Sequence, residues 1–506
     1  MLLTLRNLTL RPHQAESTLI KLCEKKLRAP CAYFKILKKS LDARDKGDIK
    51  WVYTVECSTR PQPVPVRTFE KITKAPPKVY VAGMGPAGLF CALRLLAHGI
   101  KPVLLERGKP VEEREQDVTA FCGGGALDGE SNVQFGEGGA GTFSDGKLNT
   151  QTNSPLNKEV LETFVRFGAP QEIAYLNKPH IGSDNLKKVV RNMREYILSQ
   201  GGQVRFSSKL TDVRLQGGAL VAVQVNGVWE DADELVLAVG HSARDVFEMC
   251  LSRGFLLEQK EFAAGVRIEH LQENISYAQY GAEYKALPPA DYKLVSHSSE
   301  RAAFTFCMCP GGVVIPSASE DGGVVVNGMS DYARAGRNAN SALVVQVKRE
   351  DFESEHPLAG VAFQRRLERA AFQAAGGNFR APVQRLGDFL AGKESDRFGE
   401  VQPSYARGTA FVPMQAILPP VMVTALQGAI PDMERRLKGF SAHDALLTGV
   451  ETRTSSPVRI VRGEDLQAAG LTGVYPCGEG CGYAGGITSA AADGLRVAFA
   501  LAKKYF

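Results

Sequence analysis

A glycine-rich segment near residue 80 carries the clearest chemical signal in the sequence. Gly83, Gly85 and Gly88 follow the pattern G-x-G-x-x-G, directly after the apolar run 79–82 and before a stretch with helical spacing. Glu106 closes the next apolar run. Strand, glycine turn, helix, strand and acid in this order are typical of dinucleotide-binding folds, whereas the glycine pattern alone is weak. We therefore expect a dinucleotide site here rather than a glycine turn without a ligand.

Each residue of this segment has a physical task. Gly83 permits the tight turn, and Gly85 lets a pyrophosphate approach the main chain. Gly88 lets the helix pack close to the strand, and the helix N-terminus faces the phosphate charge. Glu106 is expected to accept hydrogen bonds from the ribose hydroxyls.

Residues near the C-terminus favour FAD over NAD. Gly478 and Glu479 follow an apolar run at 474–477, and Gly485-Gly486-Ile487 opens the last helix. In FAD-binding oxidoreductases a late strand ending in Gly-Asp contacts the ribityl chain, and the next helix points at the flavin ring. A site built from both ends of a 430-residue stretch suits a long ligand. The apolar strand that ends at Gly240 is expected to close the same half of the fold.

At these positions the sequence resembles the bacterial FAD-dependent dehydrogenases of uncharacterised function, which are related to flavoproteins of glutathione-reductase-like topology. The resemblance covers nearly the whole chain, and its most specific segments are 131–148, 306–312, 327–330 and 477–487. It implies bound FAD and an oxidoreductase, but it names no substrate. The residues expected to bind the cofactor are Gly83, Gly85, Pro86, Ala87, Gly88, Glu106, Arg107, Gly138, Gly139, Ala140, Gly141, Thr142, Ser144, Gly240, Gly478, Glu479, Gly485, Gly486 and Ile487.

Two basic residues are weak candidates for catalysis. Lys147 ends the glycine-rich loop 136–147, whose N–H groups could stabilise charge on a reduced flavin. Arg453 could grip an anionic substrate, or it could equally belong to an inter-domain ion pair. The acid or base that moves protons is not identified, because none of the eight histidines forms a catalytic pattern. A structural role is expected for His241.

The predicted fold class is α/β, with three parts. Residues 1–70 read as a small basic βαββ unit, ferredoxin-like, before a proline-rich linker. Residues 76–261 and 446–506 form a discontinuous Rossmann-type FAD-binding domain. The inserted residues 262–445 are expected to form a β-rich α+β cap over the substrate, with antiparallel strands at 262–335 and a helical stretch at 341–375.

The ten cysteines are irregularly spaced. Cys307-Met308-Cys309 and Cys477-x-x-x-Cys481 lack the C-x-x-C or C-x-x-x-x-C spacing usual in flavin disulfide reductases. They also lack an ordinary zinc spacing. Buried, inert thiols are therefore favoured over a redox disulfide, and no metal is expected. The reduced thiols, the absence of a signal peptide and the absence of a long apolar run predict a cytoplasmic protein without a membrane span.

The partners are less well defined. Residues 1–70 hold 14 Lys/Arg against 7 Asp/Glu, so the whole basic excess of the chain lies there. An alternative function is therefore a flavoprotein that associates with RNA or an acidic protein through this unit, although no base-stacking aromatic pattern accompanies the charge. The main hypothesis is an FAD-dependent oxidoreductase acting on a small substrate or electron carrier. NAD(P)H is possible as electron donor, but a second dinucleotide motif is missing.

Overall fold

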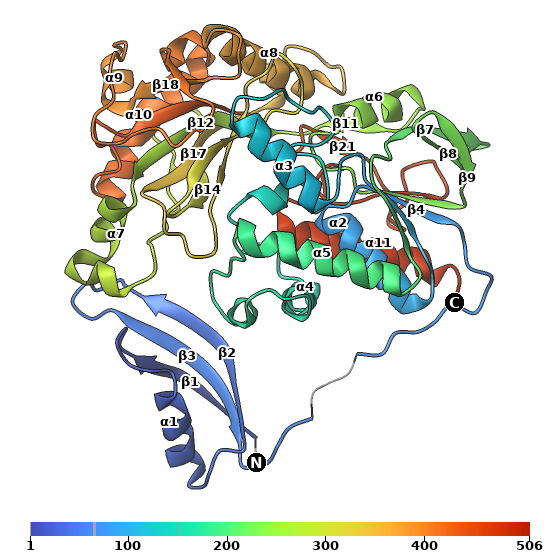
Figure 1. Cartoon of the computed structure of the whole chain (residues 1–506), viewed down its shortest axis with the longest axis horizontal. Helices are drawn as coiled ribbons and strands as arrows, with labels where there is room; N and C mark the ends of the chain where they lie inside the picture. The colour runs from blue at the N-terminus through green and yellow to red at the C-terminus, as the bar shows by residue number, and fades with distance from the viewer. Residues whose placement is uncertain (1, 64–66, 151) are drawn as a thin grey trace.

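The computed structural model describes residues 2–63, 67–150 and 152–506. A small N-terminal unit stands apart from a larger body that contains two main sheets (Figure 1). One of these sheets is parallel and the other is mostly antiparallel, which confirms the mixed α/β class. No helix among the described residues is both long and apolar enough to cross a membrane.

The parallel sheet carries the glycine turn at the carboxyl end of its middle strand. Its strands in spatial order are β22 (Val474–Pro476), β10 (Glu234–Leu237), β4 (Val79–Ala82), β5 (Val103–Leu105) and β6 (Gln203–Arg205). All of β4, β5, β10 and β22 is buried, as expected for parallel strands covered on both faces. Helix α2 (Pro86–His98) follows β4, and α11 (Ile487–Lys503) follows β22.

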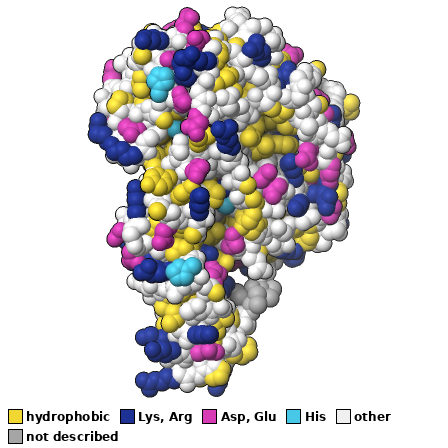
Figure 2. All heavy atoms as spheres, turned by 60° about the vertical axis from the view of Figure 1, so that its left-hand side comes forward, with side chains coloured by type: hydrophobic (Ala, Val, Ile, Leu, Met, Phe, Trp, Pro, Cys, Tyr) yellow, Lys and Arg dark blue, Asp and Glu magenta, His cyan; other side chains and the backbone are white. Residues whose placement is uncertain are grey.

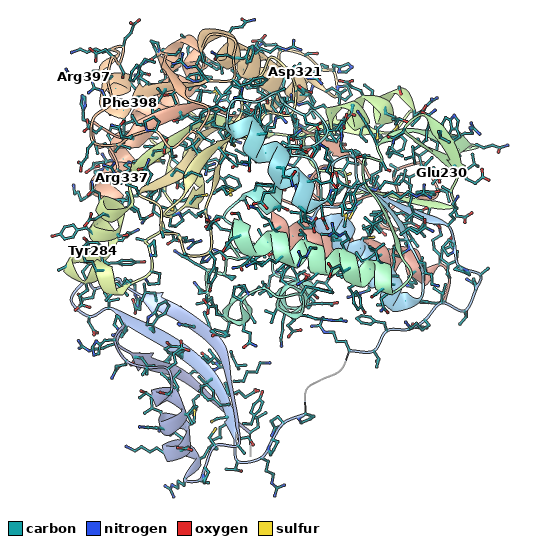
Figure 3. All side chains as sticks on the ribbon, in the orientation of Figure 1. Glu230, Tyr284, Asp321, Arg337, Arg397 and Phe398 are labelled. Carbon is teal, nitrogen blue, oxygen red and sulfur yellow. The ribbon has the colours of Figure 1, made fainter. Side chains whose placement is uncertain are left out.

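Further elements cover this sheet. The helices are α3 (Val111–Cys122), α4 (Leu156–Arg166), α5 (Ser183–Ser199) and α6 (Arg244–Ser252). A three-stranded antiparallel sheet consists of β7 (Leu210–Gln216), β8 (Ala219–Val225) and β9 (Val228–Asp231). Glu230 of β9 lies on this sheet (Figure 3). It joins this sheet to the parallel one, because it accepts hydrogen bonds from Tyr80 (2.7 Å) and Arg205 (2.8 Å).

The second main sheet has seven strands and a large apolar core of its own. In spatial order they are β13 (Val295–Ser296), β14 (Ala303–Cys309), β17 (Asn338–Val347), β12 (Phe262–Leu271), β20 (Leu446–Glu451), β18 (Ala381–Arg385) and β19 (Thr409–Phe411). Its helices are α7 (Gln272–Tyr280), α8 (Ala359–Ala374), α9 (Leu386–Ala391) and α10 (Pro420–Arg436). Two short ribbons complete the body: β15 (Val313–Pro316) with β16 (Val326–Met329), and β11 (Leu257–Gln259) with β21 (Val458–Ile460).

Two expectations for this region are wrong. The stretch 341–375 is not helical throughout, because β17 occupies its start and only α8 is a long helix. Nine of the ten residues of β17 are buried, and its run Ala342–Val345 is apolar on both faces of the strand, so it shows no two-residue period. The boundary expected at residue 445 also fails, because β20 pairs with β12 and β18 in the seven-stranded sheet.

The N-terminal unit has the element order strand, helix, strand, strand. Its elements are β1 (Leu2–Leu10), α1 (Thr18–Leu27), β2 (Tyr33–Asp42) and β3 (Lys50–Ser58), with β3 in the middle of the sheet. The edge strand β2 contacts the body: the N–H of Lys39 donates to the carbonyl of Tyr175 (2.8 Å), and the N–H of Asn177 donates to the carbonyl of Lys39 (2.9 Å). Basic side chains lie at the outer end of this unit, with acidic ones among them (Figure 2).

The close packing of α11 on α2 gives a direct test of the fold. A Cβ added at Gly494 of α11 would lie 2.1 Å from the carbonyl oxygen of Ala87 in α2, so G494A has to push two backbones apart. Overpacking of this kind costs about 1–3 kcal/mol, which predicts a Tm lower by at least about 2 °C in a thermal unfolding scan.

The matched control is G428A on α10, an exposed helical glycine whose added Cβ would approach nothing closer than 3.5 Å. This control is expected to be neutral or slightly stabilising, because alanine favours helices. Equal Tm values for the two variants would contradict the packing described for α11 and α2.

Candidate functional site

A cavity at the carboxyl end of the parallel sheet brings together residues from both main sheets. Most of the residues expected to bind the cofactor line it. They are Gly83, Gly85, Pro86, Ala87, Glu106, Arg107, Gly139, Ala140, Gly141, Ser144, Gly240, Glu479, Gly485, Gly486 and Ile487. Lys147 and Arg453 line the same cavity. The seven-stranded sheet and its ribbon contribute Cys307, Cys309, Asn327 and Glu451.

Four of the expected residues lie behind the wall rather than on it. A Cβ at Gly88 would lie 1.9 Å from the carbonyl oxygen of Gly83, so this glycine serves helix packing, as expected. Gly138 and Thr142 border a second, small cavity beside α2. Gly478 has a φ of +77°, and an added Cβ there would meet the side chain of Ala87 at 2.7 Å. These four residues therefore shape the cavity through packing and do not line it.

Two helices begin at this cavity. Gly85 precedes α2 and Gly486 precedes α11, and no side chain caps either N-terminus. The first-turn N–H groups of both helices therefore have no partner within their helix, and both dipoles favour negative charge at the cavity. A Cβ at Gly85 would meet nothing closer than 3.8 Å, and one at Gly485 would meet nothing within 4 Å. The main chain is thus open to a ligand at both helix starts.

Glu106 fastens this end of the sheet. Its buried carboxylate accepts main-chain N–H groups of Met84 (2.9 Å), Gly108 (2.9 Å) and Gly136 (3.0 Å). A carboxylate offers about four acceptor positions, so about one is left for a ligand hydroxyl. The expected contact with a ribose hydroxyl can therefore be at most about one of the hydrogen bonds that Glu106 accepts, and the other three stabilise the main chain. Arg107 is fixed beside it, because its guanidinium carbon lies 4.0 Å from the ring centre of Phe135.

Lys147 is held by the loop that precedes it and by the second sheet. Its ammonium group donates to the Asp145 carboxylate at 2.6 Å and makes a very short contact with the carbonyl oxygen of Met308. Arg334 also pairs with Asp145, so two cations share one buried carboxylate. Burial lowers the pKa of Lys147, but Asp145 and the neighbouring Cys309 and Cys307 together outweigh it, so the pKa lies above its usual value. Lys147 is therefore a fixed cation on the cavity wall.

Arg453 belongs to a buried ion network between the two main sheets. It donates to Glu368 of α8 at 3.1 Å and to Ser319 at 2.6 Å. Arg244, at the start of α6, pairs with the same carboxylate at 2.8 Å. These contacts correspond to an inter-domain ion pair, which is one of the two roles expected for Arg453. The residue also lines the cavity.

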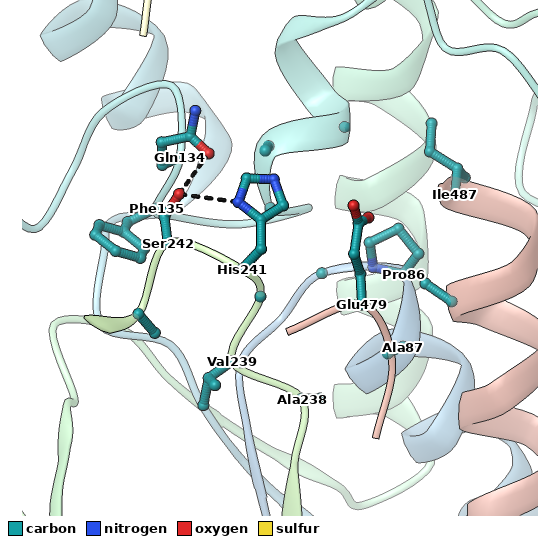
Figure 4. A pocket seen from close by; sticks show the side chains of 18 of the residues that line it. Pro86, Ala87, Gln134, Phe135, Ala238, Val239, His241, Ser242, Glu479 and Ile487 are labelled. Atoms are coloured by element: carbon teal, nitrogen blue, oxygen red, sulfur yellow. Dashed lines mark hydrogen bonds between the residues drawn. The ribbon is translucent and has the colours of Figure 1, made fainter. Parts of the chain in front are cut away.

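Glu479 reaches into the cavity from the turn before α11 (Figure 4). Its carboxylate has no hydrogen-bond partner among the described side chains, and Lys260 is the nearby cation. Burial raises the pKa of Glu479 to about 7, and Lys260 only partly opposes this effect. At neutral pH the site therefore contains a carboxyl group that can both hold and release a proton.

His241 is the functional candidate that sequence reasoning missed. It follows Gly240 at the end of β10, lines the cavity and contacts Ser242 through Nδ1 at 3.1 Å (Figure 4). Burial, followed by the charges of Arg453 and Arg244, lowers the pKa of His241 to about 4. The available signal was its place at a carboxyl strand end of the sheet, where ligands bind in such folds.

The hydrogen bonds around Ser242 determine which nitrogen of His241 carries the proton. The amide nitrogen of Gln134 donates to the carbonyl of Ser317 (3.3 Å), so its amide oxygen must be the atom that faces Ser242. The Ser242 hydroxyl donates its one hydrogen to that oxygen (3.0 Å) and accepts from Arg453 (3.1 Å). His241 must therefore donate through Nδ1, which leaves Nε2 as an acceptor for a ligand in the cavity.

The expectation that the cysteines are buried is wrong for Cys307. It is the one exposed cysteine of the ten, all of which are free and lie in described segments. Cys307, Cys309 and Cys477 line the cavity. The reason is an irregularity in β14 that sequence spacing does not reveal, because the pairing register with β17 shifts between Phe306 and Cys309.

Comparison with known proteins gives the chain a family. A model described as "FAD-dependent protein, C-terminal domain-like" matches residues 261–454, and a domain of unknown function (DUF8436) matches residues 3–58. An uncharacterised protein of Clostridium beijerinckii is 45% identical over 491 residues, which are 93% of this chain and 92% of that protein. The chain belongs to the same family as that protein. The match to the model of the FAD-dependent protein family confirms FAD as the cofactor expected from the sequence.

Solved structures give weaker likenesses. CtdE in complex with FAD aligns with 85% of this chain and 84% of its own, at a TM-score of 0.36 and 12% identity. FqzB aligns with 86% and 77%, at 0.39 and 14%. Glycine oxidase from Geobacillus kaustophilus aligns with 85% and 95%, at 0.38 and 9%. These TM-scores are too low to indicate which reaction this chain carries out.

The protonation of His241 can be measured directly. In protein labelled with 15N-histidine, we expect NMR to show His241 as a neutral ring with hydrogen on Nδ1 from pH 6 to pH 8, because its pKa lies well below this range. The variant H241Q assigns the signal. S242A removes the acceptor for Nδ1 and should shift hydrogen toward Nε2. A protonated ring at pH 7, or hydrogen on Nε2 in the unaltered protein, would contradict the network.

Proposed function

We propose that this chain is an FAD-dependent oxidoreductase whose cofactor lies along the cavity between the two main sheets. The observation that carries the proposal is the meeting of two uncapped helix N-termini, α2 and α11, at one cavity that the second sheet also lines. The N–H groups and dipole at the start of α2 suit a pyrophosphate, and those at the start of α11 suit negative charge at the flavin end of the same long ligand. Bound FAD supplies hydride chemistry at its flavin ring.

The residues of the chain have distinct tasks in this proposal. Gly85, Gly139 and the first turn of α2 form the cradle for the pyrophosphate, since the Gly85 and Gly139 main chains face each other with no side chain between them. Gly485 and Gly486 leave the start of α11 open to the flavin end. Lys147 and the N–H groups of its loop place positive charge where a reduced ring carries negative charge.

Proton movement is assigned to two groups of the cavity. His241 offers an unprotonated Nε2 at neutral pH and can accept a proton from a substrate O–H or N–H. Glu479 has a pKa of about 7 and can hold or return a proton. Paired groups whose environments separate their pKa values are typical of acid–base sites. The substrate binds between the flavin and the seven-stranded sheet, where Asn327 and Glu451 form the far wall.

The electron donor enters through the same cavity in this proposal. The sequence contains no second strand–G-x-G-x-x-G–helix unit, so NADH or NADPH, if it serves, binds without a Rossmann domain of its own. Anaerobic addition of either nucleotide to the purified protein tests this point. Rapid bleaching of the flavin bands identifies a pyridine-nucleotide donor, and persistent bands point to a substrate or another carrier.

The variant G85A tests the cofactor site without disturbing the fold. Its added methyl group would meet protein atoms only at ordinary contact distance, 3.8 Å, yet it would occupy the space that the pyrophosphate needs. We expect the Kd for FAD, measured by flavin fluorescence, to rise at least about tenfold, which corresponds to about 1.4 kcal/mol. The Tm of the apoprotein should stay unchanged.

G428A, remote from the cavity, is the matched control and should bind FAD as the unaltered protein does. An unchanged Kd in G85A would place the cofactor elsewhere. A purified protein that contains no flavin and takes up none would overturn the proposed function.

A further inference from the structure

Two thiols lie on the cavity wall in a short irregular stretch of β14. Cys307 and Cys309 both line the cavity, and Cys307 is exposed to it. Between the pairs Phe306–Ala342 and Cys309–Asn340, β14 advances by three residues while β17 advances by two. One extra residue is therefore inserted into β14, which makes this stretch a β-bulge. Bulges redirect side chains and are frequent beside active sites.

The backbone at the bulge is in an unusual conformation. Cys307 has a φ of +44°, in the left-handed region that side chains other than glycine rarely adopt. Strain of this kind persists only where surrounding contacts hold it. The cost is not repaid by packing, because the Cys307 side chain is exposed.

Two cations hold the bulge in place. Arg267 donates to the carbonyl oxygen of Cys307 at 2.6 Å, and Lys147 contacts the carbonyl oxygen of Met308. The Arg267 guanidinium also lies 3.8 Å from the Cys309 sulfur. The Cys309 thiol donates to the carbonyl of Cys307 at 3.3 Å, so its sulfur lies against the main chain of the other cysteine. The glycine-rich loop of the cofactor site thus contacts the thiol segment directly through Lys147.

We propose that Cys307 and Cys309 are a redox-active pair that exchanges two electrons with FAD. The inference rests on the proposed function, since it requires FAD in the cavity that the two thiols line. In the oxidising direction two S–H bonds break and one S–S bond forms between Cys307 and Cys309. The sulfurs lose two electrons, and these pass with two protons to FAD, which becomes FADH2. In the other direction FADH2 reduces the disulfide to two thiols.

The spacing permits this bond. Two residues of regular strand span roughly 6.6 Å, which is near the upper limit of the Cα separation in disulfides. A bulge bends the strand and shortens that span. The Cys307 side chain is exposed toward the cavity, but the protein that surrounds the cavity desolvates its thiol, which raises the pKa of Cys307 to about 11 although Lys147 acts in the opposite direction. Burial also raises the pKa of Cys309. The reduced pair is therefore a protonated dithiol at neutral pH, as the balanced step assumes.

An anaerobic reductive titration of the FAD-loaded protein counts the electrons. After oxidation in air, we expect four electrons per FAD, two for the flavin and two for the disulfide. The variants C307S and C309S should each take two, with FAD still bound. The matched control C31S, in the N-terminal unit, should take four, because Cys31 lies outside the cavity.

Mass spectrometry gives a readout independent of flavin colour. Alkylation under denaturing conditions should leave the peptide with residues 307 and 309 unlabelled in the oxidised protein and two hydrogens lighter. Both cysteines should be labelled after reduction. If C307S does not fold, judged by its Tm, C307A replaces it, and the peptide mass of the unaltered protein still decides.

The outcomes separate the two proposals. FAD-loaded protein that takes only two electrons and has both thiols labelled after oxidation would overturn the redox pair alone. Protein that binds no FAD would overturn the proposed function and the electron exchange with it.

Discussion

The contact between α2 and α11 is the constraint on which the rest of the site depends. Helix α2 follows β4, and α11 follows β22, which lies almost four hundred residues after β4 in the sequence. They meet backbone to backbone, because Gly494 carries no side chain against Ala87. Each helix runs back antiparallel to the strand before it, and the strands are parallel to one another, so both helix N-termini open at the carboxyl edge of the sheet. A long dinucleotide can then contact both ends of the chain at once.

A second constraint fixes the seven-stranded sheet over that edge. Glu368 of α8 forms ion pairs with Arg244 from α6 and with Arg453 from the segment after β20. All three side chains are buried. The charges of the two arginines hold the pKa of Glu368 well below its usual range despite burial. Removing Glu368 would leave the buried charge of Arg453 uncompensated, which typically costs about 3–5 kcal/mol. The cavity therefore has a far wall in a defined position rather than a mobile one.

The sequence identified most residues on one side of the cavity and few on the opposite wall, for physical reasons. Gly83, Gly85 and Glu106 lie within one βαβ unit, where spacing alone fixes their relation. The apolar run of β17 was mistaken for helix, because a strand buried on both faces has no two-residue period. Cys307 reaches the cavity through a bulge, and the hydrogen on Nδ1 of His241 is determined by Ser242, Gln134 and Arg453. Such relations depend on segments distant in sequence, and one sequence does not contain them.

Lys147 connects the two halves of the chemistry. It closes the glycine-rich loop, which the sequence places at the cofactor, and it contacts the carbonyl next to both thiols. Its ammonium group is fixed by Asp145, which Arg334 also binds, so the cation cannot move away from the bulge without leaving a buried carboxylate underpaired. A change of charge in the glycine-rich loop therefore alters the electrostatic potential at the thiol segment, and the reverse also holds. This coupling is what a flavin and a dithiol that share electrons across one cavity require.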